Sequence, residues 1–218
     1  MTERASRIWM CGIPGSKWSG IDMHMRQVLP CDQTDESDER TCYHRASTPD
    51  DTNNGHRGSY WGPGMGCGED WIDFNFMDKS KIINDIDEVF TGTGYKIIKD
   101  HFLARKFNLD YVWNNFSGDY VVLVYREPQK SFAWWSEVMD FSEGHYPDYA
   151  PGYTDYNTMR KLLWTESAKI TDFAVRKDMN FSLYNNQAFN SINGFDKKIS
   201  NTLTINNSDT YISVKRIP

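Results

Sequence analysis

Short apolar runs alternate along the chain with segments whose apolar residues recur at helical spacing. Within residues 7–11 and 119–125, apolar residues run without interruption from Ile8 to Cys11 and from Tyr120 to Tyr125, and a shorter apolar run lies within residues 95–101. Runs of this kind predict strands that are buried on both faces of a parallel sheet. A fourth strand is expected at residues 210–214.

Apolar residues spaced three and four apart predict helices between these strands. The predicted helices cover residues 21–29, about 78–90, about 129–140 and 158–173, with a helix or turn at 102–112. Because strands and helices alternate, we expect an α/β fold with three α/β/α layers around a mainly parallel sheet.

Length and composition predict one folded domain. A chain of 218 residues is long enough for a single α/β core, so residues 1–218 are interpreted as one domain. Two segments interrupt the pattern, a polar, glycine-rich insertion at about 31–70 and a tyrosine-rich loop at about 142–158. An aromatic content of 15% argues against a disordered chain, because disordered chains lack the residues that build a core.

Charge and hydropathy narrow the class of partner. A net charge of −6 argues against nucleic acid, which attracts basic surfaces. No run approaches the roughly 18 apolar residues of a membrane span and no long apolar leader is present, so we expect a cytoplasmic protein without a membrane partner. The four cysteines form no CxxC pair, and free thiols are favoured over a metal site at Cys31, Cys42, His44 and Cys67.

The turn after the first predicted strand carries the candidate chemistry. It reads Gly12-Ile-Pro-Gly-Ser-Lys-Trp-Ser19 and leads into the first predicted helix. We call residues 12–19 the phosphate loop. Glycines let backbone N–H groups approach a phosphate closely, and a helix N-terminus adds partial positive charge. With further donors from Ser16, Lys17 and Ser19, the loop predicts an anion site.

Spacing distinguishes this loop from that of a kinase. In the GxxxxGK[ST] motif the lysine follows the first glycine by six positions, whereas Lys17 follows Gly12 by five. A kinase also needs a carboxylate on a neighbouring strand to hold Mg²⁺, but the strand at 119–125 is followed by Arg126. A cation there suits a second phosphate, so no metal is expected.

These features resemble the P-loop-like sulfotransferases, whose fold is like that of the P-loop-containing nucleotide hydrolases. The phosphate loop is similar to the family's Gly-x-Pro-Lys/Arg-Ser-Gly-Thr-Thr/Ser form. The coinciding residues are Gly12, Pro14, Ser16 and Ser19, and the departing ones are Gly15, Lys17 and Trp18. We expect Lys17 to replace the cation that the family carries at the position of Gly15.

Two further segments carry the resemblance. Lys99-Asp-His101 is similar to a Lys-x-His segment whose histidine takes the acceptor proton. Arg126-Glu-Pro128 is similar to Arg-Asp-Pro, whose arginine binds a 3′-phosphate. The resemblance covers about residues 7–30 and 95–140.

The resemblance implies metal-independent, in-line transfer of a sulfuryl group from 3′-phosphoadenylyl sulfate to a small-molecule or glycan acceptor, leaving adenosine 3′,5′-bisphosphate. His101 would be the general base, Lys17 would stabilise charge on the transferred group, and Lys99 would help position it. The expected cofactor-binding residues are Gly12, Pro14, Gly15, Ser16, Lys17, Trp18, Ser19 and Arg126, with Ser131 or Ser136 assisting Arg126 because the family's serine position is Trp134 here. The alternatives are a small P-loop kinase and a nucleotide-binding module without turnover.

Overall fold

The computed structural model describes residues 7–35, 60–62, 67–138, 154–205 and 209–218. The elements in these ranges are, in chain order, β1 (Arg7–Gly12), α1 (Trp18–Val28), the 3-10 helix η1 (Phe74–Phe76), α2 (Lys79–Val89), β2 (Lys96–Lys99), the 3-10 helix η2 (Phe102–Ala104), α3 (Asn108–Asn115), β3 (Tyr120–Arg126), α4 (Pro128–Val138), α5 (Tyr156–Arg176), β4 (Ser182–Leu183), α6 (Lys197–Ser200) and β5 (Thr210–Arg216). None of the helices in these ranges combines the length and the apolar character needed to span a bilayer.

The five described strands form one mostly parallel sheet in the order β2-β1-β3-β5-β4. β1 pairs in parallel with β2 on one side and with β3 on the other. β5 runs antiparallel to both of its neighbours, β3 and β4. The carboxyl ends of β1, β2 and β3 therefore meet at one edge of the sheet.

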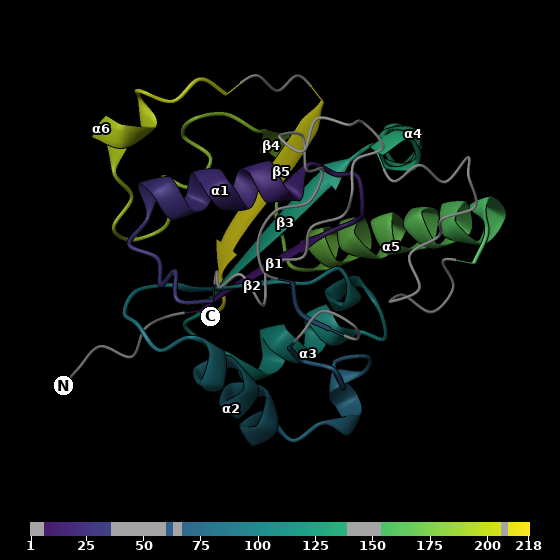
Figure 1. The fold of residues 1–218 in the computed structure, drawn as a ribbon, viewed down its shortest axis with the longest axis horizontal. Coiled ribbons are helices and arrows are strands. Elements are labelled where there is room, and N and C mark those ends of the chain that lie inside the picture. The colour runs from purple at the N-terminus through teal and green to yellow at the C-terminus, as the bar shows by residue number, and fades with distance from the viewer. Residues whose placement is uncertain (1–6, 36–59, 63–66, 139–153, 206–208) are drawn as a thin grey trace.

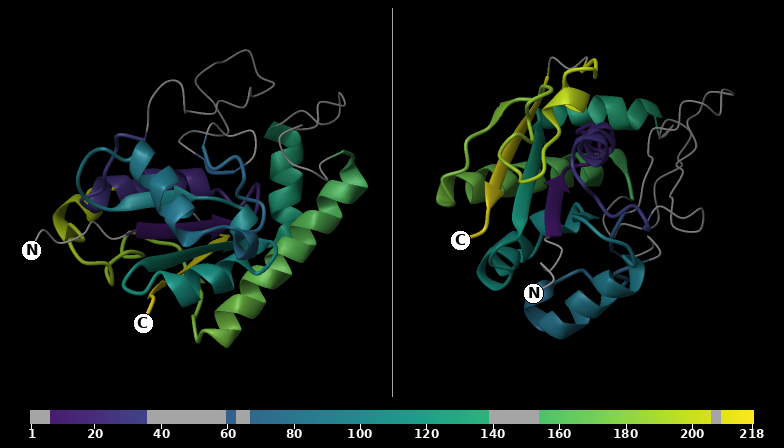
Figure 2. Two further views of the ribbon diagram at one scale, coloured as in Figure 1. Left: turned by 90° about the horizontal axis from the view of Figure 1, so that it is seen from below. Right: turned by 90° about the vertical axis from the view of Figure 1, so that its left-hand side faces the viewer.

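Side chains from alternate strand positions enter two separate apolar cores, as the period of two along a strand requires. Trp9 and Cys11 enter the core that includes residues of α2, α3, α4 and α5, whereas Ile8 and Met10 enter the core formed with α1 and the segment around Phe189. α1 and α6 lie together in the upper part of Figure 1, and α2 and α3 in the lower part. α4 lies against α5, as the left view of Figure 2 shows. Because both faces are covered, the central strands are apolar throughout.

The connections after β1 and β3 leave toward opposite edges of the sheet. The chain passes from β1 through α1 and α2 to β2 on one side, and from β3 through α4 and α5 to β4 and β5 on the other. β1 and β3 are neighbours, so the two connections diverge between them. Ligands of open α/β sheets bind at such a divergence, beyond the carboxyl ends of the strands. The phosphate loop and Arg126 lie on its two sides.

The predicted strands and most predicted helices are confirmed, with shifted boundaries. α1 begins three residues before the predicted start at residue 21. The predicted helix or turn at 102–112 is divided into η2 and α3, because Lys106 and Phe107 have φ values of 50° and 62°, outside the right-handed helical region. The predicted loop at 142–158 extends too far, because Asp155 caps α5 at its start. Residues 36–59 and 63–66 of the predicted insertion, and 142–153 of that loop, lie outside the described residues.

Candidate functional site

The backbone of the phosphate loop requires glycine at position 15 and leaves little space for a side chain at position 12. Gly15 has a φ of +79°, and a Cβ built on it would lie 2.1 Å from the carbonyl oxygen of Ser131. A Cβ on Gly12 would lie 2.9 Å from Ser16 Oγ. The Ser16 N–H donates to the carbonyl of Ile13 at 3.1 Å, which closes the turn. Glycine therefore lets the loop pack directly against α4.

The start of α1 has no side-chain cap. Its N-cap residue is Lys17, which has a left-handed backbone conformation with a φ of 65° and whose side chain makes no capping hydrogen bond. The first turn of α1 also contains no acidic residue. Free N–H groups and the helix dipole at such a terminus favour an anion.

Two serine hydroxyls close to the loop are buried without a hydrogen-bond partner. Ser16 and Ser131 are fully buried, and neither Oγ has a partner among the described residues. Buried hydroxyls normally find one, so each retains the capacity to bind a ligand atom or a water molecule. Ser136 Oγ is likewise unpartnered, but only Ser131 is shown in contact with the loop. Of the two predicted assistants of Arg126, Ser131 is the one that the fold brings to the site.

Two cations from different strand ends converge on one carboxylate. Lys17 Nζ lies 3.1 Å from Oδ1 of Asp209, and the Nε and Nη2 atoms of Arg126 donate to Oδ2 at 3.0 and 2.8 Å. Burial alone would raise the pKa of Asp209, but the hydrogen bonds from Arg126 and Lys17 hold it below its usual value. The predicted anion-binding cations thus already hold an anionic group.

Arg126 also fastens the loop. Its Nη1 atom donates to the Gly15 carbonyl at 3.0 Å, and the residue is only 7% exposed. A guanidinium can bind a carboxylate and a carbonyl at once because its N–H donors form a rigid planar fork. Arg126 is therefore a structural partner of the loop as well as a candidate ligand group.

Aromatic side chains lie beside the loop. Trp18 is buried, and its ring centroid lies 5.5 Å from that of Tyr60 and 6.2 Å from that of His101. The hydroxyls of Ser19 and Tyr60 are 2.5 Å apart. His101 is 5% exposed and stacks on Phe102. The structure thus brings His101 to the side of the loop, while Pro14 lies buried in the turn itself.

The predicted contact of Lys99 with the transferred group is corrected. The side chain is fully buried, its Nζ lies 2.8 Å from Asp22 Oδ2, and it faces the Tyr60 ring at 4.2 Å. Burial lowers the pKa of Lys99, but the charge and hydrogen bond of Asp22 outweigh this and raise it. Lys99 therefore holds α1 against β2, and any effect on the loop is transmitted through that helix.

The ion pair of Lys99 belongs to a larger buried network. Asp22 also accepts from Arg26 Nε at 2.8 Å, and Arg26 binds Asp35 through two hydrogen bonds of 2.9 and 3.0 Å. Alternating charges compensate the cost of removing each one from water. The network fixes residues 32–35 and the ring of Tyr60 beside α1.

No sequence motif marks Asp209, Asp22 or Tyr60, which the fold brings to the site. Asp209 directly precedes β5 and carries no motif, and it meets Arg126 only because β5 pairs with β3.

Of the residues considered for a metal site, Cys42 and His44 lie outside the described residues. Within the described ranges, no group of three His, Cys, Asp or Glu residues could hold a metal ion.

A comparison of this chain with family models, with curated proteins and with solved structures finds no match. The chemistry of the site therefore rests on the geometry described above.

Proposed function

We propose that the chain binds a nucleotide through its phosphate groups at the phosphate loop and acts as a sulfotransferase that uses 3′-phosphoadenylyl sulfate. One observation carries the proposal: Lys17 and Arg126, from two neighbouring strand ends, hold a single carboxylate beside an uncapped helix. A position that holds a carboxylate between two cations also suits a phosphate or sulfate oxygen.

The residues present fit the anionic end of this cofactor. The uncapped N–H groups of α1, the unpartnered Ser16 hydroxyl and the Lys17 ammonium are donors for the 5′-phosphosulfate. Arg126, with Ser131 beside it, would bind the 3′-phosphate once Asp209 has moved away. When bound, 3′-phosphoadenylyl sulfate supplies the sulfuryl group that is transferred.

His101 would supply the general base. It follows β2 at the edge where the phosphate loop begins, and its ring lies beside that of Trp18. A neutral imidazole nitrogen can take the proton of an acceptor hydroxyl near neutral pH. Lys17 would stabilise negative charge on the transferred group, since its ammonium is the cation carried by the loop itself.

Calorimetry without Mg²⁺ tests the proposal directly. We expect adenosine 3′,5′-bisphosphate to bind more tightly than AMP or ATP. If Arg126 binds the 3′-phosphate, Arg126→Ala should weaken the binding of the bisphosphate more than the binding of AMP. The control Lys130→Ala removes an exposed cation on α4 and should change the binding of neither ligand. Equal losses for both ligands would contradict the role of Arg126. ATP preference that appears only with Mg²⁺ would favour a kinase.

A second candidate is a binding module without turnover. It is favoured because all three predicted cations already form ion pairs within the protein. Lys99 pairs with Asp22, and both Lys17 and Arg126 pair with Asp209. The two functions differ in transfer of sulfate from a radiolabelled donor across a panel of hydroxyl acceptors. Transfer that His101→Ala abolishes while nucleotide binding persists would support the enzyme. Binding without any transfer would support the module.

A further inference from the structure

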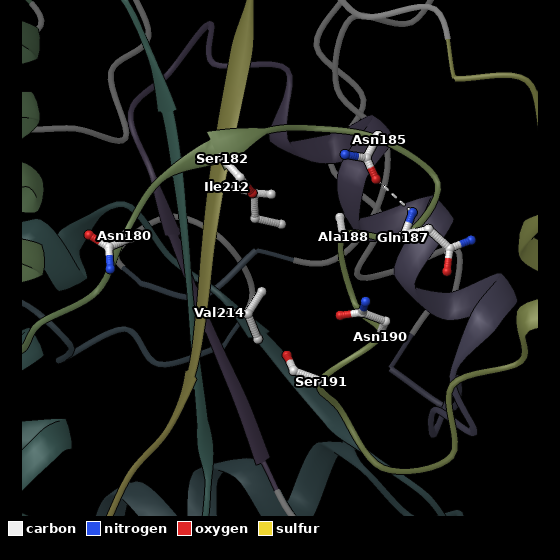
Figure 3. Close-up of a pocket in the computed structure, with 9 residues that line it drawn as sticks. All are labelled: Asn180, Ser182, Asn185, Gln187, Ala188, Asn190, Ser191, Ile212 and Val214. Atoms are coloured by element: carbon white, nitrogen blue, oxygen red, sulfur yellow. Dashed lines mark hydrogen bonds between the residues drawn. The ribbon is translucent and has the colours of Figure 1, made fainter.

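A hollow lies beside β5, near the β4 edge of the sheet. It has a volume of about 330 Å³ and lies between the β4 and β5 strands and the segment 185–191 (Figure 3). Its lining consists of Asn180, Ser182, Asn185, Gln187, Ala188, Asn190, Ser191, Ile212 and Val214. This volume is near the lower end of the roughly 300–1,000 Å³ of small-molecule pockets.

The lining has an unusual chemical character. Four of its residues carry primary amides and two carry hydroxyls, while the described lining holds no charged and no aromatic side chain. Ile212 and Val214 of β5, together with Ala188, add a small apolar surface. The hollow therefore offers many neutral donors and acceptors around a short aliphatic strip.

Four of the polar side chains are available to a ligand. Asn180, Ser182, Asn190 and Ser191 are exposed, and within the described parts of the chain their side chains make no hydrogen bond to other residues. Their donors and acceptors come from two sides of the hollow, as Figure 3 shows.

The wall formed by residues 185–191 is held in place from behind. Asn185 Oδ1 accepts from the N–H of Gln187 at 2.8 Å, and Gln187 Nε2 donates to Asn201 Oδ1 at 3.2 Å. Phe189 is fully buried in the core beside α1. Asn186 donates to the carbonyls of Ser200 and Leu203. Because the wall is anchored before any ligand arrives, little ordering is needed on binding.

We propose that this hollow, the amide groove, binds a neutral, hydroxyl-rich ligand, specifically one or two units of a saccharide. Primary amides present a donor and an acceptor side by side, which matches the neighbouring hydroxyls of a sugar ring. An anion would meet no cation among the lining residues, and a nucleobase would meet no aromatic ring. The aliphatic strip suits the C–H groups of a sugar.

The amide groove is separate from the phosphate loop and does not depend on the proposed sulfotransferase activity. β5 is two strands from β1 in the sheet, which corresponds to about 10 Å before side chains are counted. A sugar in the groove and a nucleotide at the loop would therefore occupy different sites.

Nuclear magnetic resonance of the ¹⁵N-labelled full chain tests the proposal, because side-chain amides give their own signals. The probes are maltotriose, cellotriose and chitotriose, each titrated to about 10 mM, tenfold above a Kd of 1 mM. We expect one of them to shift the amide signals of Asn180 and Asn190, which the Asn→Ala variants assign. Failure of all three to shift these signals overturns the proposal.

A matched pair of variants locates the binding. Asn190→Ala should weaken the binding of the saccharide about fivefold, which is the effect expected from the loss of one hydrogen bond. Asn193→Ala removes the same kind of side chain from an exposed position two residues beyond the segment 185–191 and outside the lining, so it should leave the affinity unchanged. Equal effects of the two variants, or no effect of Asn190→Ala, would place the binding elsewhere and overturn the proposal. Adenosine 3′,5′-bisphosphate should not shift the Asn190 signal.

Discussion

The N-termini of α1 and α5 are built in opposite ways. At α5, Asp155 Oδ1 accepts from the N–H groups of Asn157 and Thr158 at 2.8 and 3.0 Å, and Thr158 Oγ1 donates to Oδ2 at 2.7 Å. At α1, the N-cap residue is Lys17, a cation with a left-handed backbone conformation. The first N–H groups of α5 are bonded by the side chain of its N-cap residue Asp155, whereas those of α1 receive no hydrogen bond from the side chain of its N-cap residue Lys17.

Four of the other helices, α2, α3, α5 and α6, differ from α1 at their N-termini. Asp78 caps α2 and Asp196 caps α6, while α3 lacks a cap but carries Asp110 in its first turn. Among α1, α2, α3, α5 and α6, α1 alone has neither a side-chain cap nor an acid in its first turn. The chain caps α2, α5 and α6 with aspartate but starts α1 with lysine, so the charge at this terminus is the one that would favour an anion.

The largest effect should come from the glycine that shapes the α1 terminus. Gly15→Ala places a methyl group 2.1 Å from the Ser131 carbonyl at a positive φ, so we expect unfolding free energy to fall by about 3 kcal/mol and nucleotide binding to disappear. Gly20→Ala is the control, since its Cβ would meet nothing within 4 Å, and it should stabilise α1 by up to about 1 kcal/mol. Urea unfolding with calorimetry measures both, and a neutral Gly15→Ala would refute the described packing.

The Asp209 carboxylate should compete with the proposed nucleotide for Lys17 and Arg126. Asp209→Asn removes the carboxylate that Lys17 and Arg126 share, so we expect the affinity for adenosine 3′,5′-bisphosphate to rise about tenfold. Asp178→Asn removes an equal charge from an exposed position and should change the affinity little. Weaker binding by Asp209→Asn would show that the carboxylate orders the site rather than occupying it.

Acid should remove the contribution of Asp209 to stability. Because the pKa of Asp209 is lowered in the folded chain, its contribution is present above the pKa of an unfolded aspartate, about 3.9, and is lost as the pH falls through the folded value. The stability difference between the wild type and Asp209→Asn should therefore be constant from pH 7 to about 5 and shrink as the pH falls below about 4. Thermal unfolding across this range measures it, and a difference that persists in acid would contradict the ion pairs.

The smallest effect should come from the capped N-terminus of α5. Asp155→Ala removes the cap of α5 and should lower Tm by about 2–4 °C, the typical result of losing one cap in a chain of this size. Asp155→Asn should retain most of the cap, and neither variant should alter nucleotide affinity. A loss of affinity on Asp155→Ala would mean that the two termini are coupled.

β1, β2, β3 and β5 could be predicted from the sequence because their apolar residues are local signals, whereas β4, a strand of two residues, was not predicted. The direction of β5 could not, since antiparallel pairing of Thr210 with Arg126 depends on a contact between residues 84 positions apart, which no local pattern encodes. Residues 12–19 follow β1 and lead into α1, as the end of the apolar run predicted. The glycine requirement at Gly15 follows from α4, which packs against it.

The role of Lys99 illustrates the limit of motifs. A lysine at a strand end resembles a catalytic cation, but the sequence does not reveal that Asp22 lies beside it in the core. His101, two residues later, does reach the side of the phosphate loop through its neighbour Trp18. The sequence shows which residues are charged, whereas the packing of the folded chain decides which partner each charged side chain has.

The contacts beside α1 also hold Asp35 and Tyr60 to the same helix. Asp35 is bonded to Arg26, and Tyr60 to Ser19, seven positions earlier on α1 and about 10 Å along its axis. Because both contacts are made to one rigid helix, the separation of Asp35 and Tyr60 is set by the length of α1 between Ser19 and Arg26. The helix therefore acts as a ruler that relates two positions 25 residues apart in the sequence.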